Sequence, residues 1–273
     1  MTDTARSAAR EGRASAERLR RSTPFRTAAR VGFAVNGLLH VLIGVIALRV
    51  AFGGGGSTDQ SGALSAIAKS PGGVFLLWVI VVGLWALGLF NLLTAALIRG
   101  GDGDAWKERA SLIGKGIAYL AVGGTAFTFA RGSSSSSASS SRGFTAQLLA
   151  HPGGVFLLIV VALAVVGIGA YFVVKGAKQK FREDLVVPSG TAGRVTVVLG
   201  VVGYIAKGIA LAIVGVLFGV AAATSDPSEA TGLDGALHTL ATLPFGVALL
   251  TAVAVGFIAY GVYQGVRARY ARL

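Results

Sequence analysis

Six long apolar stretches, separated by polar segments, dominate the pattern of residues along the chain. Each stretch has about 20 residues or more, the length that a helix needs to cross a hydrocarbon core about 30 Å thick. Apolar residues follow one another without the alternation of barrel strands, so the pattern predicts helices. The predicted membrane spans are Val31–Phe52, Val74–Ile98, Ala110–Ala130, Val155–Val174, Val195–Ala223 and Phe245–Val266.

The heptapeptide PGGVFLL occurs twice, at Pro71–Leu77 and Pro152–Leu158, and a related sequence, PFGVALL, occurs at Pro244–Leu250. Each copy follows a short stretch in which apolar residues recur at helical spacing: ALSAIAKS, FTAQLLAH and ALHTLATL. We expect a short helix at the membrane surface that ends before the proline, with the proline in the first turn of the returning span. Pro71, Pro152 and Pro244 are therefore predicted elbows between the two helices.

The first, third and fifth spans also repeat one another, as NGLLHVLIG, KGIAYLAVG and KGIALAIVG. In each copy a polar residue precedes a glycine, and a second glycine follows seven residues later, on the same face of a helix. Small residues allow helix backbones to approach closely in lipid, so these glycines are predicted to lie at helix contacts. They are Gly37, Gly44, Gly116, Gly123, Gly208 and Gly215.

These two patterns together predict an all-α, polytopic membrane protein built from three tandem two-helix repeats. Two spans per repeat restore the orientation each time, so we expect an approximate threefold pseudosymmetry about an axis along the membrane normal. The predicted units are a basic tail, 1–29, and repeats at 30–98, 109–178 and 194–267.

Composition and charge agree with a membrane protein and orient it. Of the 273 residues, 53% are hydrophobic and 14% charged, against about 25% charged in a typical soluble domain. Most of the lysines and arginines lie in the tail, in the two loops between repeats and at the C-terminal end, so both termini are predicted to be cytoplasmic in a multi-pass protein of the cell membrane. The net charge of +13 then indicates anionic lipid headgroups as partners, rather than nucleic acid, because no basic patch is interleaved with aromatic residues.

The repeated polar–Gly–x6–Gly span, the elbow sequence and the glycine and aromatic residue that follow it resemble a bacterial, largely actinobacterial, family known as domain of unknown function 1206. The resemblance extends from Arg30 to Arg267. It implies an integral membrane protein with three two-helix repeats, and it implies no activity and no functional residues. Within this pattern, Phe245 replaces the first glycine of the third elbow, and Asn36 replaces the lysine of the other two repeats.

Asn36, Lys115 and Lys207 occupy one equivalent position per repeat, and charge inside a membrane span points to function. Two orientations are open. Facing the axis, the two ammonium groups and the amide would form a cationic site for an anion, a lipid phosphate or a carboxylate; facing outward, each lysine would extend its amine to the inner interface. His40 lies on the same helical face as Asn36 and is a further candidate, although bonding to a neighbouring carbonyl is the simpler role.

Other chemistry finds little support in the sequence. No acidic residue lies within a predicted span, cysteine is absent, and the histidines lack acidic neighbours, so we expect no enzyme, no metal site and no cofactor. The acidic residues of the outer loops, Asp59, Asp226, Glu229 and Asp234, are expected to be solvated. We expect a non-enzymatic scaffold or accessory protein that binds lipid, a protein partner or a second copy; the alternative is a channel or carrier for an anion or small solute along the axis.

Overall fold

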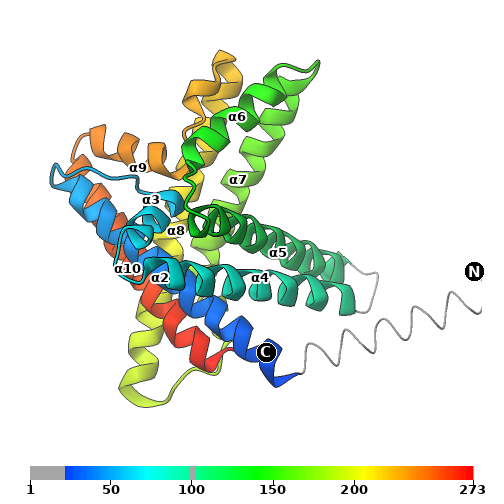
Figure 1. Ribbon diagram of the computed structural model, residues 1–273. Helices are drawn as coiled ribbons and strands as arrows, with labels where there is room; N and C mark the ends of the chain where they lie inside the picture. Colours follow the sequence, from blue (N-terminus) through cyan, green and yellow to red (C-terminus); the bar gives the residue numbers. More distant parts are fainter. Residues whose placement is uncertain (1–21, 99–102, 273) are drawn as a thin grey trace, which may run out of the picture.

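The computed structural model describes residues 22–98 and 103–272, so most of the predicted basic tail lies outside the described residues. Within this part, six helices are long and apolar enough to cross a membrane (Figure 1). They are α2 (Thr23–Ala51), α4 (Gly73–Leu97), α5 (Gly103–Ala130), α7 (Gly154–Ala177), α8 (Gly190–Thr224) and α10 (Gly246–Tyr270). The shorter elements are α3 (Gln60–Ala68), α6 (Ser137–Leu149) and α9 (Gly232–Thr242), with single 3₁₀ turns η1 (Lys180–Asp184) and η2 (Pro227–Glu229).

The closest helix contacts join different repeats. Helix α4 packs on α5, α7 on α8, and α10 returns to α2, so each repeat's second span meets the first span of the next repeat. The same pair of glycines lies at each of these three junctions: Gly88 with Gly116, Gly169 with Gly208, and Gly261 with Gly37. A Cβ atom on Gly37 would lie 2.6 Å from the carbonyl oxygen of Gly261, which leaves no room for a side chain.

The second glycine of each predicted pair also lies between helices. A Cβ on Gly44 would meet the carbonyl oxygen of Ala254 at 2.7 Å, and one on Gly215 would meet the Val166 nitrogen at 2.7 Å. Gly123 lies against the indole ring of Trp85. Helix packing in lipid depends on such close approach, so these positions fix how the three junctions fit together.

The elbows explain the repeated PGG sequence. In Ser70-Pro71-Gly72-Gly73 the N–H of Gly73 donates to the carbonyl of Ser70, and Gly72 has φ +72°, the features of a type II turn with proline at its second position. Gly73 then has no space for a Cβ, which would collide with the carbonyl oxygen of Ile67. The returning helix begins at Gly73 itself, so Pro71 lies in the turn before the span. The prediction that the proline occupies the first turn of the helix was therefore wrong.

The third elbow has the same turn with a residue poorly suited to it. Phe245 takes the left-handed position at φ +60°, where the other two elbows have Gly72 and Gly153, and its side chain is 87% exposed. This conformation costs a non-glycine residue roughly 1–2 kcal/mol.

We therefore expect Phe245→Gly to stabilise the protein by about 1 kcal/mol, because glycine removes the strain without removing a buried contact. The measurement is the thermal midpoint of the detergent-solubilised protein, determined by size-exclusion chromatography after heating to a series of temperatures. Gly72→Phe in the first elbow is the converse control and should lower the midpoint. A lower midpoint for Phe245→Gly would contradict this account of the turn.

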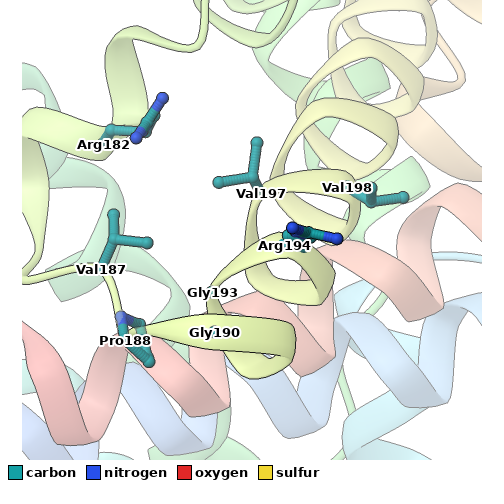
Figure 2. A pocket seen from close by; sticks show the side chains of 8 residues that line it. All are labelled: Arg182, Val187, Pro188, Gly190, Gly193, Arg194, Val197 and Val198. Atoms are coloured by element: carbon teal, nitrogen blue, oxygen red, sulfur yellow. The ribbon is translucent and has the colours of Figure 1, made fainter.

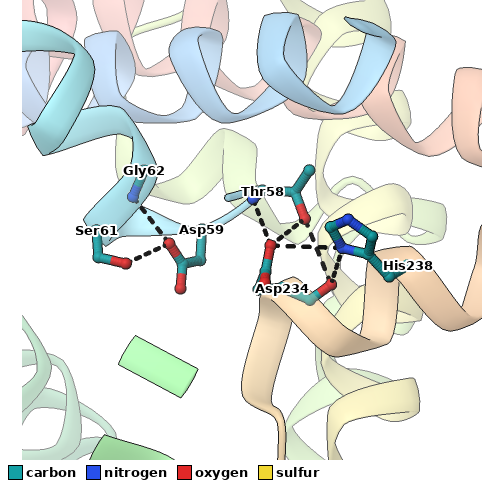
Figure 3. Close-up of polar contacts among 6 residues, drawn as sticks. All are labelled: Thr58, Asp59, Ser61, Gly62, Asp234 and His238. Carbon is teal, nitrogen blue, oxygen red and sulfur yellow. Dashed lines mark hydrogen bonds and ion pairs between the residues drawn. The ribbon is translucent and has the colours of Figure 1, made fainter. Parts of the chain in front are cut away.

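The loops and short helices of the three repeats meet at the elbow end of the bundle. The backbone N–H of Thr58 donates to Asp234 Oδ1 at 2.6 Å, joining repeat 1 to α9, and His238 lies 3.5 Å from the same carboxylate (Figure 3). The Ser137 N–H donates to the Ser61 hydroxyl at 3.3 Å, joining repeat 2 to repeat 1. The three elbow helices therefore lie on one face of the protein.

One acidic residue of these loops is not solvated, contrary to the prediction. Asp59 is 1% exposed and caps α3, accepting hydrogen bonds from the Gly62 N–H and the Ser61 hydroxyl (Figure 3). Asp234 is partly buried by its bonds to Thr58, whereas Asp226 and Glu229 are exposed as expected. The partner of Asp234 lies in another repeat, so local sequence does not indicate its bonds, whereas Asp59 caps a helix of its own repeat.

Burial is uneven along the bundle. The half near the elbows holds the main apolar core, formed chiefly by α2, α3, α4 and α10; its fully buried residues include Leu39, Ile43, Leu64, Leu77, Ile80, Leu84 and Leu250. In the most apolar part of α5 only 22% of residues are buried, and in that of α7 only 17%, against 56% in α2, α4 and α10. Repeat 2 is thus the least enclosed part of the protein.

Candidate functional site

The predicted residues Asn36 and His40 meet Lys207 inside the bundle. His40 Nδ1 lies 2.7 Å from the backbone carbonyl oxygen of Asn36, one turn earlier on α2, and can only donate to it. In the neutral imidazole Nε2 is then the acceptor, and it lies 3.2 Å from the Lys207 amine of α8. The histidine therefore has the carbonyl role expected for it and also orients a lysine from another repeat.

Aromatic rings surround the Lys207 amine. It lies 4.5 Å from the centre of the Tyr260 ring on α10 and 5.5 Å from that of Phe172 on α7. His40 itself packs against Tyr260, with ring centres 4.7 Å apart. The faces of aromatic rings attract cations, so these contacts favour the charged form of the lysine and partly offset its burial.

A cluster of buried aromatic rings adjoins this lysine through Tyr260. Tyr204 stacks on Phe181 of η1 with ring centres 5.4 Å apart, and it meets Tyr260 and Tyr263 edge to face at 5.2 and 5.7 Å. Phe181 and Tyr263 are fully buried. Because Phe181 lies in the loop between α7 and α8, this packing fixes the loop against the spans.

The same loop brings an acidic residue to the bundle. The N–H of Val186 donates to the Tyr270 carbonyl at 2.9 Å, and the N–H of Arg272 donates to the Asp184 carbonyl at 3.3 Å. These bonds tie residues 184–186 to the end of α10. Asp184 consequently lies beside two cations of the spans: its Oδ2 is 2.7 Å from Lys175 Nζ and 3.6 Å from an Arg267 nitrogen.

Three cations act on the carboxylate of Asp184: Arg267, Lys175 and Lys115. Burial alone would raise the pKa of this carboxyl group, but Arg267 and Lys175 lower it by more, and Lys115 lowers it further, so that the pKa lies below its ordinary value. We call Lys115, Lys175, Lys207 and Arg267, together with Asp184, the cationic cluster. The cluster holds four cations and one carboxylate.

Several buried polar atoms near the cluster have no hydrogen-bond partner among the described residues. Gln264 is fully buried, and neither its oxygen nor its nitrogen is bonded. The Asn36 amide nitrogen, in a side chain 8% exposed, and the Arg267 Nε are also unbonded. Unpaired polar atoms in a protein interior are rare and costly, so the site has capacity for a further polar group.

The three equivalent positions do not play equivalent roles. Lys207 points into the bundle, where it contacts His40 and Tyr260, and Asn36 is buried beside them. Lys115 is half-buried on α5, within electrostatic reach of Asp184, and forms no hydrogen bond or ion pair with the described residues. The predicted site residues thus lie in the same half of the bundle, although Lys115 does not touch the other two.

Sequence reasoning missed Asp184, Gln264 and the tyrosines, and it placed Lys175 and Arg267 among exposed loop charges. A signal for the last two was present: both stand six residues after the glycine that forms a repeat junction, Gly169 or Gly261. Both are largely buried, with side chains 7% and 17% exposed. For Asp184 there was no signal beyond its being acidic in a basic loop.

A separate pocket of about 440 Å³ lies beside the start of α8 (Figure 2). Its walls are mostly apolar, and it includes the exposed residues Arg182 and Arg194. It contains none of the unbonded polar atoms described above, so we place the candidate site at the cationic cluster. No group of three or more metal-ligating side chains occurs in the residues that the structure describes.

Comparison with known proteins gives a family without an assigned activity. The family model described as Domain of Unknown Function (DUF1206) matches three times, at residues 31–97, 110–179 and 202–271. A protein of Bacillus subtilis (strain 168), "Uncharacterized protein YxxB", is 28% identical over 253 residues, covering 88% of this chain and 89% of its own. No solved structure matches the chain.

Proposed function

Since the chain belongs to the DUF1206 family, which carries no activity to transfer, we propose from the site alone that this membrane protein binds an acidic group, a phosphate or carboxylate, at the cationic cluster. The proposed role is binding, because the cluster supplies positive charge and unbonded amide groups. Lys115 and Lys207, which form no ion pair with a carboxylate among the described residues, would hold the acidic group.

The excess of positive charge is the observation that carries this proposal. Asp184 is already bonded to Lys175 and close to Arg267, and neither Lys115 nor Lys207 forms an ion pair with a carboxylate among the described residues. Charge in a membrane span is costly unless it is paired, so two such lysines are retained at a cost to stability unless a ligand neutralises them. The unbonded amides of Asn36 and Gln264 supply further hydrogen bonds for an oxygen-rich group.

The packing of the bundle favours binding over conduction. An ion path along the axis would need polar groups through the whole membrane, but the half near the elbows is filled with buried leucine and isoleucine side chains. With the basic ends of the chain in the cytoplasm, as the distribution of charge favours, the cluster lies in the inner half of the membrane, where anionic headgroups are available.

The test is a comparison of two double variants. Lys115→Ala with Lys207→Ala should weaken binding of dioleoyl phosphatidylglycerol by about tenfold or more, because each lysine contributes a charge-assisted contact. Lys69→Ala with Lys178→Ala removes the same charge from exposed positions and is the matched control. Native mass spectrometry of the purified protein, titrated with the lipid, gives the affinities; equal affinity in both double variants would overturn the proposal.

A further inference from the structure

Repeats 1 and 3 are closed by contacts between their own two spans. In repeat 1, Gly32 of α2 lies against the Gly83 carbonyl of α4, and a Cβ on Gly32 would be 2.7 Å from the Leu87 Cβ. In repeat 3, a Cβ on Gly203 of α8 would lie 2.5 Å from the Tyr260 Cα of α10, and Gly256 lies against Ala206. Both closures therefore use a glycine on each span.

Repeat 2 lacks these glycines. Gly32 and Gly203 stand four residues before Asn36 and Lys207, and the residue four before Lys115 is Ser111. Gly83 and Gly256 stand five residues before the junction glycines, and the equivalent residue in repeat 2 is Ala164. A side chain thus occurs on both spans where the other repeats have none, so the sequence itself disfavours closure of this repeat.

The structure agrees with that reading of repeat 2. Helices α5 and α7 make almost no contact, and in Figure 1 the α4–α5 pair extends away from the α7–α8 pair. Gly114, beside Lys115, has nothing within 4 Å of a Cβ built on it, and Ile168 is 49% exposed where its counterpart Tyr260 is 4% exposed. We call Ser111, Gly114, Ala164 and Ile168 the open face of repeat 2.

The open face adjoins the lysines of the cluster. Gly114 immediately precedes Lys115 on α5, and Phe172, one turn after Ile168 on α7, contacts the Lys207 amine. Towards the elbows the same two helices expose apolar side chains, among them Ile117 at 59% and Leu163 at 67%. A cationic end and an apolar continuation therefore lie side by side on one unpaired surface of the bundle.

We propose that the open face of repeat 2 is a lateral entrance from the membrane, and that its occupant is an acidic amphiphile, such as a phospholipid with a negatively charged head. The inference rests on the proposed function and names its ligand class. The head lies at Lys115 and Lys207, which its charge complements, and the hydrocarbon chains lie along α5 and α7. A soluble anion would satisfy the lysines alone and would leave the apolar surface unused.

The experiment fills the open face and leaves the lysines intact. Gly114→Trp introduces an indole where nothing else stands, and it should weaken binding of dioleoyl phosphatidic acid about tenfold. Gly265→Trp is the matched control, because this exposed glycine of α10 also has nothing within 4 Å of a Cβ, on a helix that packs chiefly against α2 and α8. Ala164→Phe fills the same surface from the facing helix and should act in the same direction.

Native mass spectrometry of the full chain gives phosphatidic acid affinities, with inorganic phosphate added as a competitor and phosphatidylcholine as a neutral lipid. Normal affinity in Gly114→Trp and Ala164→Phe, with loss in the Lys115→Ala, Lys207→Ala double variant, would overturn the lateral entrance and leave the proposed function standing. Normal affinity in the lysine variant would overturn both. Two further outcomes would overturn the lateral entrance. One is displacement of phosphatidic acid by inorganic phosphate at equal concentration, and the other is a lipid-free dimer of the parent protein that Gly114→Trp dissociates.

Discussion

Replacing Gly37 by leucine is expected to lower the stability of the protein by about 3 kcal/mol or more, because the side chain would push apart the junction that joins α2 to α10. A Cβ alone would lie 2.6 Å from the Gly261 carbonyl oxygen and 3.2 Å from the Gln264 Cβ. Backbone atoms of a packed helix cannot move aside as the end of a flexible side chain can. The readout is the thermal midpoint of the detergent-solubilised protein.

The partner helix, α10, supplies the control for this prediction. Gly265→Leu adds an equal volume on α10 where nothing stands within 4 Å, and it should leave the midpoint almost unchanged. Equal tolerance of both leucines would mean that the junction is not closely packed, and it would remove the structural reason for the repeated glycine pairs.

The second large effect is expected at Asp184. Asp184→Asn removes the carboxylate from between Lys175, 7% exposed, and Arg267, 17% exposed, so two largely buried cations lose their counter-charge. Breaking a buried ion pair on one side typically costs about 3–5 kcal/mol, and we expect a loss near the lower end because the carboxylate itself is 23% exposed. Asp226→Asn, at an exposed loop position, should leave the midpoint unchanged.

The same carboxylate predicts a dependence on acid. Arg267 and Lys175 hold the pKa of Asp184 below its ordinary value, despite burial, so the folded state favours the ionised form. The resulting stabilisation is complete above the unfolded pKa of about 3.9 and is lost as the pH falls from there through the lower folded pKa. The thermal midpoint of the parent protein should drop over this range by more than that of Asp184→Asn; parallel curves would contradict the assignment.

Local patterns were enough to predict the spans, the position of each elbow and the glycines at helix contacts, but not that the prolines precede the returning helices. Length and hydropathy specify a span, and a glycine such as Gly72 follows from the geometry of one turn, so these features depend on residues close together in the chain. The seven-residue spacing of Gly37 and Gly44 is also a local feature, because it shows only that the two glycines share one face of a helix.

Contacts between residues far apart in the chain could not be predicted from such local patterns. Nothing near Gly37 indicates that it meets Gly261 and not the other span of its own repeat, and nothing near Asp59 indicates that it is buried. Asp184 pairs with Lys175 and Arg267 only because Phe181 and the bonds to Tyr270 and Arg272 fold its loop onto the bundle. The open face nevertheless has a signal in the sequence. Ser111 and Ala164 replace the glycines that close the other two repeats, although only the structure shows what those glycines do.

The junction between α10 and α2 has a consequence for biosynthesis. Of the six membrane-spanning helices that the structure describes, α2 is made first and packs most closely on the last, α10, so its Gly37 face stays exposed to lipid until α10 has been inserted. In a circularly permuted gene in which α10 directly precedes α2, these two helices would be inserted one after the other. We expect a larger share of the permuted protein than of the parent protein to escape degradation in the membrane.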